Sequence, residues 1–171
     1  AILANEGYEV AGWDPNHRPD GTLEKKDIVN LGFVINVIEN KEERDEAVKC
    51  AYGFANKLLV VSAMIANEKH IAKFQPYLDG VVTSRNTFQK YFSQDSLRSY
   101  LSEVLDQQPI ALGNGIFAIF KDEALKTSYL ESKFKRRTTW QNIRGIRLSK
   151  EEKIQLKIKD HIQLIEDYWN Y

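Results

Sequence analysis

Two apolar runs separated by a single amphipathic helix are the feature that most constrains the fold. The first run covers residues 27–31 and stops at Gly32, and the second covers residues 57–64. Between them, Asn40 is suited to cap a helix that we expect to end near residue 56. Strands that are apolar on both faces are typical of parallel sheets, and a helix between two of them forms the right-handed crossover that parallel pairing needs. The sequence therefore predicts an α/β fold.

Further elements follow from periodicity and turn chemistry. They are a strand at 8–13, an irregular stretch at 65–89, a helix at 93–105, and a hairpin formed by 110–112 and 116–120 around a Gly-Asn-Gly turn. We therefore expect a mostly parallel sheet that is closed by one antiparallel hairpin.

The two ends of the chain carry helix signals. Residues 1–7 are typical of the last turn of a helix that stops at Gly7, so we expect the chain to be the latter portion of a longer protein. Near the other end, Ser149 opens a capping box for an amphipathic helix that continues almost to the last residue. Its apolar stripe is expected to pack on a partner or on a further domain. We expect a partial α/β domain at residues 1–125, followed by a basic linker and this helix at residues 126–171.

Charge and cysteine content exclude several classes of protein. The 24 basic and 24 acidic residues give a formal net charge of zero, so composition alone predicts no attraction to nucleic acid or membranes. The single cysteine, Cys50, excludes a disulfide framework, and the three histidines lack the spacing of a metal site. No apolar run reaches the roughly 20 residues that a membrane span needs. We expect a cytoplasmic protein with no metal and no membrane partner.

Two segments are candidates for binding a nucleotide-like ligand, because such ligands bind at the carboxyl ends of strands in α/β sheets. Asp14 follows the predicted strand at 8–13, and its carboxylate can accept both hydroxyls of a ribose. Gly32 would let the backbone approach a ligand, and Phe33 could stack on a planar ring. We expect the two segments to lie side by side at one edge of the sheet. The alternatives are an Asp-Pro turn that only ends a strand, and core packing for Phe33.

Four blocks occur in order along the chain: Gly-Trp-Asp-Pro at 12–15, then residues 27–39, 83–91 and 115–123. Together they resemble the methyltransferase-like family associated with bacterial DNA phosphorothioation systems, over roughly residues 1–135. The resemblance implies a class I, Rossmann-like methyltransferase fold. It also implies a seven-stranded sheet whose last strand is antiparallel, and S-adenosylmethionine as the cofactor.

The resemblance also implies roles for individual residues. Asp14 would bind the cofactor ribose, and Asn30, Leu31, Gly32 and Phe33 would line the cofactor site at the methyl-transfer mouth. These four residues occupy the place where amino-directed DNA methyltransferases carry an Asn-Pro-Pro-aromatic tetrad that holds a flipped base. Both prolines are absent here. The family's central first strand and glycine-rich loop are also missing from the 171 residues. We therefore expect this chain by itself to be inactive.

Polar and basic residues supply candidates for substrate contact. Arg85, Asn86 and Lys90 lie in a polar loop before a helix, where Arg85 could hold a phosphate bidentately. A basic patch downstream could pair with nucleic-acid phosphates, and it consists of Lys133, Lys135, Arg136 and Arg137. The alternative for the first group is a solvated polar loop, and the alternative for the basic patch is a solvated helix end.

The predicted function is methyl transfer from S-adenosylmethionine to an unidentified acceptor, with DNA or another nucleic acid and phosphorothioation-system proteins as the partners implied. Methyl transfer depends mainly on aligning donor and acceptor, so no catalytic acid, base or metal is predicted. The alternative is a non-catalytic interaction module with the same fold, in which the terminal helix and the basic patch are contact surfaces for nucleic acid or protein.

Overall fold

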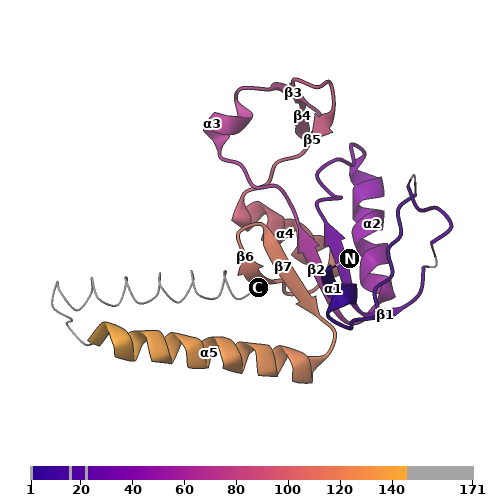
Figure 1. Ribbon diagram of the computed structural model, residues 1–171. Helices are drawn as coiled ribbons and strands as arrows, with labels where there is room; N and C mark the ends of the chain where they lie inside the picture. The colour runs from indigo at the N-terminus through magenta and orange to yellow at the C-terminus, as the bar shows by residue number, and fades with distance from the viewer. Residues whose placement is uncertain (1, 16, 22, 146–171) are drawn as a thin grey trace, which may run out of the picture. The chain divides into compact units, whose positions relative to one another are not determined.

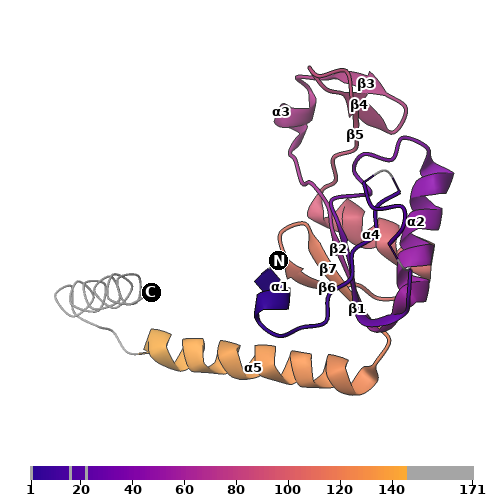
Figure 2. The ribbon, with the colours of Figure 1, turned by 45° about the vertical axis from the view of Figure 1, so that its right-hand side comes forward.

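The computed structural model describes residues 2–15, 17–21 and 23–145. The chain divides into two compact units, residues 1–126 and 127–171, and each is described by itself. The first unit contains a four-stranded sheet, a smaller three-stranded sheet and four helices, α1 to α4 (Figure 1 and Figure 2).

The larger sheet has the strand order β1-β2-β7-β6. Its strands are β1 Lys26–Gly32, β2 Ala55–Ser62, β6 Ile110–Gly113 and β7 Ile116–Phe120. β1 and β2 pair in parallel, whereas β7 pairs antiparallel with both β2 and β6. β1, β2 and β6 therefore run in one direction, and β7 runs in the opposite direction between β2 and β6.

These pairings confirm the α/β class and the parallel β1–β2 unit, and they correct one detail. The sequence predicts a mostly parallel sheet, but of the three pairings described in this sheet only that of β1 with β2 is parallel. The reason is that β7 lies between β2 and β6 and pairs antiparallel with both of them. The architecture is a mixed α/β sheet.

Helix α2, Lys41–Phe54, is the crossover that joins β1 to β2. It begins at Asn40, whose Oδ1 accepts hydrogen bonds from the amides of Glu42 (2.7 Å) and Glu43 (3.4 Å). The two glutamates also lie at the positive end of the helix dipole, which favours negative charge. The predicted helix is confirmed, and the chain passes directly into β2 at Ala55.

The core lies between the larger sheet and helices α2 and α4, Gln94–Leu105. The side chains that meet there are buried: Leu59, Val61, Phe117 and Ile119 from the strands, and Val48, Leu97 and Leu101 from the helices. Each such side chain stabilises the fold by about 2 kcal/mol through its removal from water. Ser93 begins α4 through reciprocal hydrogen bonds with Ser96, so this predicted helix is confirmed as well.

The hairpin between β6 and β7 is confirmed, and its turn requires glycine. Gly115 has a φ of +69°, and a Cβ atom added there would lie 2.5 Å from the carbonyl oxygen of Ala63. The amide of Ala63 donates to the carbonyl of Gly115 at 2.9 Å, which brings the turn against the end of β2. Both the backbone angle and the close approach exclude a side chain at this position.

Residues 65–92 form an excursion between β2 and α4, which we call the arm (Figure 1). Its base is closed by a bridge between Ile65 and Phe92, and the amide of Phe92 donates to the carbonyl of Met64 at 3.1 Å. The arm contains α3 Glu68–Ile71, β3 Gln75–Tyr77, β4 Gly80–Val82 and β5 Phe88–Gln89. Its strands form an antiparallel sheet. The prediction of an irregular stretch is wrong here, because strands of two or three residues are too short to show a periodic pattern.

The N-terminal segment departs most from prediction. Helix α1, Ile2–Asn5, ends as expected before Gly7, which has a φ of +87°. Residues 8–13 do not form the predicted strand, and Tyr8 and Val10 are 63% and 52% exposed. An alternating stretch becomes a strand only when a neighbour pairs with its backbone. Within the described residues β1 is an edge strand of its sheet and pairs only with β2.

Helix α5, Glu123–Gly145, leads into the second unit. Asp122 begins it by accepting hydrogen bonds from the amides of Ala124 (2.9 Å) and Leu125 (3.0 Å). The basic stretch that the sequence shows as a linker is part of this helix, whereas the helix predicted from Ser149 lies outside the described residues. In the part of the chain that the structure describes, no helix has the length and apolar character needed to cross a membrane.

Candidate functional site

The carboxyl ends of β1 and β2 meet at one edge of the sheet, and β1 leads there into a strained aromatic residue. Gly32 lies opposite Ser62 in the parallel register, and the amide of Phe33 donates to the carbonyl of Ser62 at 2.9 Å. Phe33 has a φ of +58°, and it is 59% exposed. A positive φ costs a non-glycine residue about 1 kcal/mol. The hydrophobic stabilisation from a largely exposed ring offsets little of that cost. Strain of this kind is typical of functional sites.

The side chains around this edge are exposed and uncharged. Val34 follows Phe33 and is 39% exposed, and Met64, two residues beyond β2, is 44% exposed. Gln89 of β5 places its amide nitrogen 3.5 Å from the sulfur of Met64. We call Phe33, Val34, Met64 and Gln89 the uncharged rim. Such a surface suits a planar or apolar ligand better than a phosphate group.

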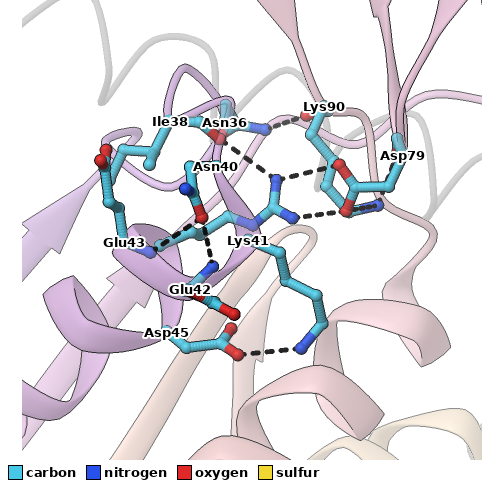
Figure 3. Close-up of polar contacts among 10 residues, drawn as sticks. Asn36, Ile38, Asn40, Lys41, Glu42, Glu43, Asp45, Asp79 and Lys90 are labelled. Carbon is cyan, nitrogen blue, oxygen red and sulfur yellow. Dashed lines mark hydrogen bonds and ion pairs between the residues drawn. The ribbon is translucent and has the colours of Figure 1, made fainter.

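A buried asparagine holds this edge together. Asn36 is 1% exposed, and its Oδ1 accepts a hydrogen bond from the amide of Met64 at 2.8 Å. Its Nδ2 donates to the carbonyl of Lys90 at 2.6 Å (Figure 3), and the amide of Lys90 donates to the carbonyl of Asn36 at 2.7 Å. Asn36 therefore joins the loop after β1, the segment after β2 and the end of the arm.

A partly buried ion-pair cluster lies beside Asn36. Arg44 of α2 is fully buried, and its guanidinium pairs with both carboxylate oxygens of Asp79, in the turn between β3 and β4. It also donates to the carbonyl of Ile38 at 3.2 Å. Lys90 pairs with the same carboxylate at 3.0 Å, so two cations converge on Asp79 (Figure 3). A buried charge is tolerated only when it is paired and hydrogen-bonded, so Arg44 depends on Asp79.

The cations of this cluster control the pKa of Asp79. Burial acts to raise the pKa of the Asp79 carboxyl, but the hydrogen bonds and positive charges of Lys90 and Arg44 outweigh it and hold the pKa below its ordinary value. Burial likewise acts against ionisation of Asp45, and hydrogen bonds led by Lys41 bring the pKa of Asp45 below its ordinary value as well. Both carboxyls are therefore ionised at neutral pH.

A hollow of about 620 Å³ lies between the β1–α2 loop and the β3–β4 turn. Its walls are formed by Val37, Ile38, Glu39, Asn40, Lys41, Glu43, Leu78 and Asp79. Leu78 has a φ of +49° and is 72% exposed, and the hydroxyl of Tyr77 donates to Glu39 at 2.9 Å. The one cation in the wall, Lys41, is paired with Asp45 at 2.8 Å. Asp79 is paired with Arg44 and Lys90, so the acidic character of the wall comes from Glu39 and Glu43, and it favours an apolar or cationic group over a phosphate.

Asp14 lies in a local turn. Its Oδ1 accepts a hydrogen bond from the amide of His17 at 2.7 Å, and the amide of Arg18 donates to its carbonyl at 2.9 Å. Because residues 8–13 form no strand, Asp14 does not follow the carboxyl end of one. The prediction that Asp14 and the residues after β1 follow two neighbouring strands is therefore wrong, and the turn that the sequence offers as an alternative is present.

The residues before Phe33 form the end of β1. Leu31 packs against the core, whereas Asn30 is exposed and, by the alternation of a strand, belongs to the opposite face. A Cβ atom added at Gly32 would find Asn30 Nδ2, at 3.4 Å, as its nearest neighbour. Packing within the described structure therefore does not require glycine at this position.

The three substrate candidates of the arm lie in two places. Arg85 and Asn86 are exposed in the turn between β4 and β5, which a hydrogen bond of 2.8 Å between the hydroxyls of Thr83 and Thr87 closes. Lys90 lies at the base of the arm, within the ion-pair cluster. Arg85 and Asn86 are accessible to a ligand, and Lys90 is held by the structure.

The basic patch predicted from the sequence belongs to α5. Lys133 is exposed, and its ammonium group lies 5.8 Å from the ring centre of Tyr129. Lys135, Arg136 and Arg137 belong to the same helix, and their side chains lie outside the described part of the chain.

Comparisons with known proteins add no family to these observations. A scan against protein-family models finds no match for this chain, and a search of curated proteins finds none either. Among the described residues, no group of three or more His, Cys, Asp or Glu side chains is placed to hold a metal ion. Function is therefore argued from the edge of the sheet and the hollow beside it.

Proposed function

We propose that this chain is a methyltransferase-like domain that binds S-adenosylmethionine and presents its methyl group to an acceptor, as the family resemblance implies. The observation that carries the proposal is the carboxyl end of β1, where Gly32 is followed by the strained and exposed Phe33. Ligands of open α/β sheets bind at this edge. An antiparallel last strand, as in β7, is also expected of a class I methyltransferase.

In this proposal Leu31, Gly32 and Phe33 line the mouth through which the methyl group passes. No packing contact explains glycine at position 32, and the close approach of a ligand would explain it. Asn30 would hydrogen-bond the acceptor, and Phe33 would stack on its planar part. These residues act by position, because methyl transfer depends on the alignment of donor and acceptor.

Asp14 would bind the ribose hydroxyls of the cofactor. A carboxylate has two oxygens, so it can accept both hydroxyls of a diol. The 171 residues contain no glycine-rich loop between a strand and a helix, so the methionine end would be held by groups that they do not supply. We therefore expect this chain by itself to bind the cofactor weakly and to transfer no methyl group.

The resemblance suggests a nucleic-acid acceptor, in a cytoplasmic phosphorothioation system with its own proteins. Arg85 and Asn86, in their exposed turn, and Lys133 with the other basic residues of α5 are the candidates for phosphate contact. Lys90 is not one of them, because its ammonium group is paired with Asp79. A nucleic-acid backbone would avoid the acidic hollow.

A non-catalytic interaction module is the second candidate, and one observation favours it. β1 is an edge strand of the described sheet, and Ile28 within it is 59% exposed. Edge strands that expose an apolar side chain pair readily with a strand of another protein. In that case a partner would cover β1, and no cofactor would be needed.

Calorimetric titration with S-adenosylhomocysteine separates the two candidates. For the methyltransferase we expect saturable binding with a dissociation constant of about 1 mM or lower, weakened roughly tenfold in both Gly32→Ala and Asp14→Ala. Leu112→Ala is the matched control, since Leu112 is an exposed residue of β6, and it should leave binding unchanged. No saturable binding at about 10 mM ligand would reject the cofactor proposal and leave the interaction module.

A further inference from the structure

The arm has almost no hydrophobic core of its own. Of residues 65–91, all of which the structure describes, only Val81 is buried. A sheet of strands with two or three residues is not stable by its own packing. The position of the arm must therefore come from contacts with the rest of the unit.

Besides the packing of Ile65 and Phe92 at its base, the contacts that hold the arm are polar and come from two places. Asn36, in the loop after β1, exchanges hydrogen bonds of 2.6 and 2.7 Å with the backbone of Lys90 at the end of the arm. Arg44, in α2, pairs with Asp79 in the turn between β3 and β4. Figure 3 shows Asn36 beside Lys90, and Asp79 next to Lys90.

The ion pair couples the position of the arm to a buried charge. The side chain of Arg44 is 1% exposed, whereas that of Asp79 is 38% exposed, so the cation belongs to the interior and the anion to the arm. If the arm moved away, the guanidinium of Arg44 would lose its pairing with the Asp79 carboxylate and keep the hydrogen bond to the Ile38 carbonyl, so separation of the arm costs this ion pair. Lys90 adds a second cation to the same carboxylate from within the arm.

We propose that the arm is a docked element and that Arg44 and Asn36 are its positioning residues, which set the width of the hollow between the β1–α2 loop and the β3–β4 turn. The hollow has one wall from the β1–α2 loop and the other from Leu78 and Asp79 of the arm, so docking of the arm determines its width. This goes beyond the proposed function, because the same docking would shape the entrance for any ligand of this edge.

Hydrogen–deuterium exchange of the full chain, read peptide by peptide, tests the proposal without a cofactor. Asp79→Asn should raise exchange in peptides of the arm by about tenfold or more, with α4 and β7 unchanged. Arg44→Met should have a smaller effect on the arm, since Lys90 still pairs with Asp79. Lys41→Ala is the control. It also removes a cation from α2, but Lys41 is paired with Asp45 and not with the arm.

If Asp79→Asn alone unfolds the whole unit, the double variant Arg44→Met with Asp79→Asn still tests the proposal. The buried charge is then gone, so α4 and β7 should recover their protection, while the arm, held by Asn36 and without the ion pair, should remain less protected than in the unmodified chain. Unchanged exchange of the arm in both Asp79→Asn and the double variant would overturn the proposal. Equal exchange of arm and core in the double variant would also overturn it, because the pair would then support the fold as a whole and not the arm.

Discussion

The amide of Phe33 donates to the carbonyl of Ser62 at 2.9 Å, so the ladder between β1 and β2 holds a backbone that has already turned to a φ of +58°. The backbone hydrogen bonding between the two strands therefore extends one residue beyond β1, to Phe33, whose backbone is strained. The ring of Phe33 at this position is 59% exposed.

Phe33→Gly should be more stable than Phe33→Ala by about 1 kcal/mol. Alanine retains the cost of the positive φ, which glycine does not carry, and both variants lose the same exposed ring. Urea unfolding of the two variants measures the difference. Equal free energies of unfolding would show that the backbone at position 33 relaxes once the ring is removed.

Gly115→Ala should destabilise the protein by about 2–4 kcal/mol, because an alanine would be strained at a φ of +69° and its Cβ would meet the Ala63 carbonyl. Gly113→Ala, in the same hairpin, is the matched comparison. The nearest atom to a Cβ at position 113 is 3.8 Å away, so this variant should lie within about 1 kcal/mol of the unmodified chain. Similar losses in the two variants, followed by thermal unfolding, would contradict this account of the turn.

Acid should remove the contribution of Asp79 to stability. Its folded-state pKa is held below the ordinary value of 3.8, so the contribution is complete above about pH 4 and is lost as pH falls through the lower folded pKa. Urea midpoints measured between about pH 7 and pH 3 should therefore fall less steeply below pH 4 in Asp79→Asn than in the unmodified chain. A steeper fall in the variant would mean that the cations do not stabilise this carboxylate.

Leu97→Ala should cost about 2–5 kcal/mol of unfolding free energy, since Leu97 is fully buried between α4 and the sheet. Leu112→Ala removes the same atoms from a side chain that is 40% exposed, and it should cost less than about 1 kcal/mol. Chemical denaturation of both variants gives the comparison. Comparable losses would indicate that Leu112 is covered in solution.

The elements that could be predicted from the sequence are those with a local cause. β1 and β2 are runs of apolar residues, and Asn40 caps the helix between them with its own side chain. The hairpin follows from the glycines of its turn. The strand predicted at residues 8–13 is absent, because alternation describes side chains and a strand also requires a partner for its backbone.

The candidate site was predicted only where it follows from the end of a strand. Gly32 and Phe33 are next to each other in the sequence, so their position at the carboxyl edge follows from β1 itself. Arg44 carried a weak signal, since it lies four residues before the buried Val48 on the same face of α2. Asn36 and Asp79 carried none, because their side-chain partners lie 11 to 54 positions away along the chain.

The place of β7 between β2 and β6 has a consequence for biosynthesis. Chains emerge from the ribosome beginning at the N-terminus, so β1, α2 and β2 are exposed before the strand that connects them to β6 has been made. A pair of strands alone is marginally stable, and among the described strands β6 has no neighbour in its sheet except β7. Nascent chains arrested before residue 116 should therefore remain sensitive to protease, and resistance should arise in one step once residue 120 has left the exit tunnel.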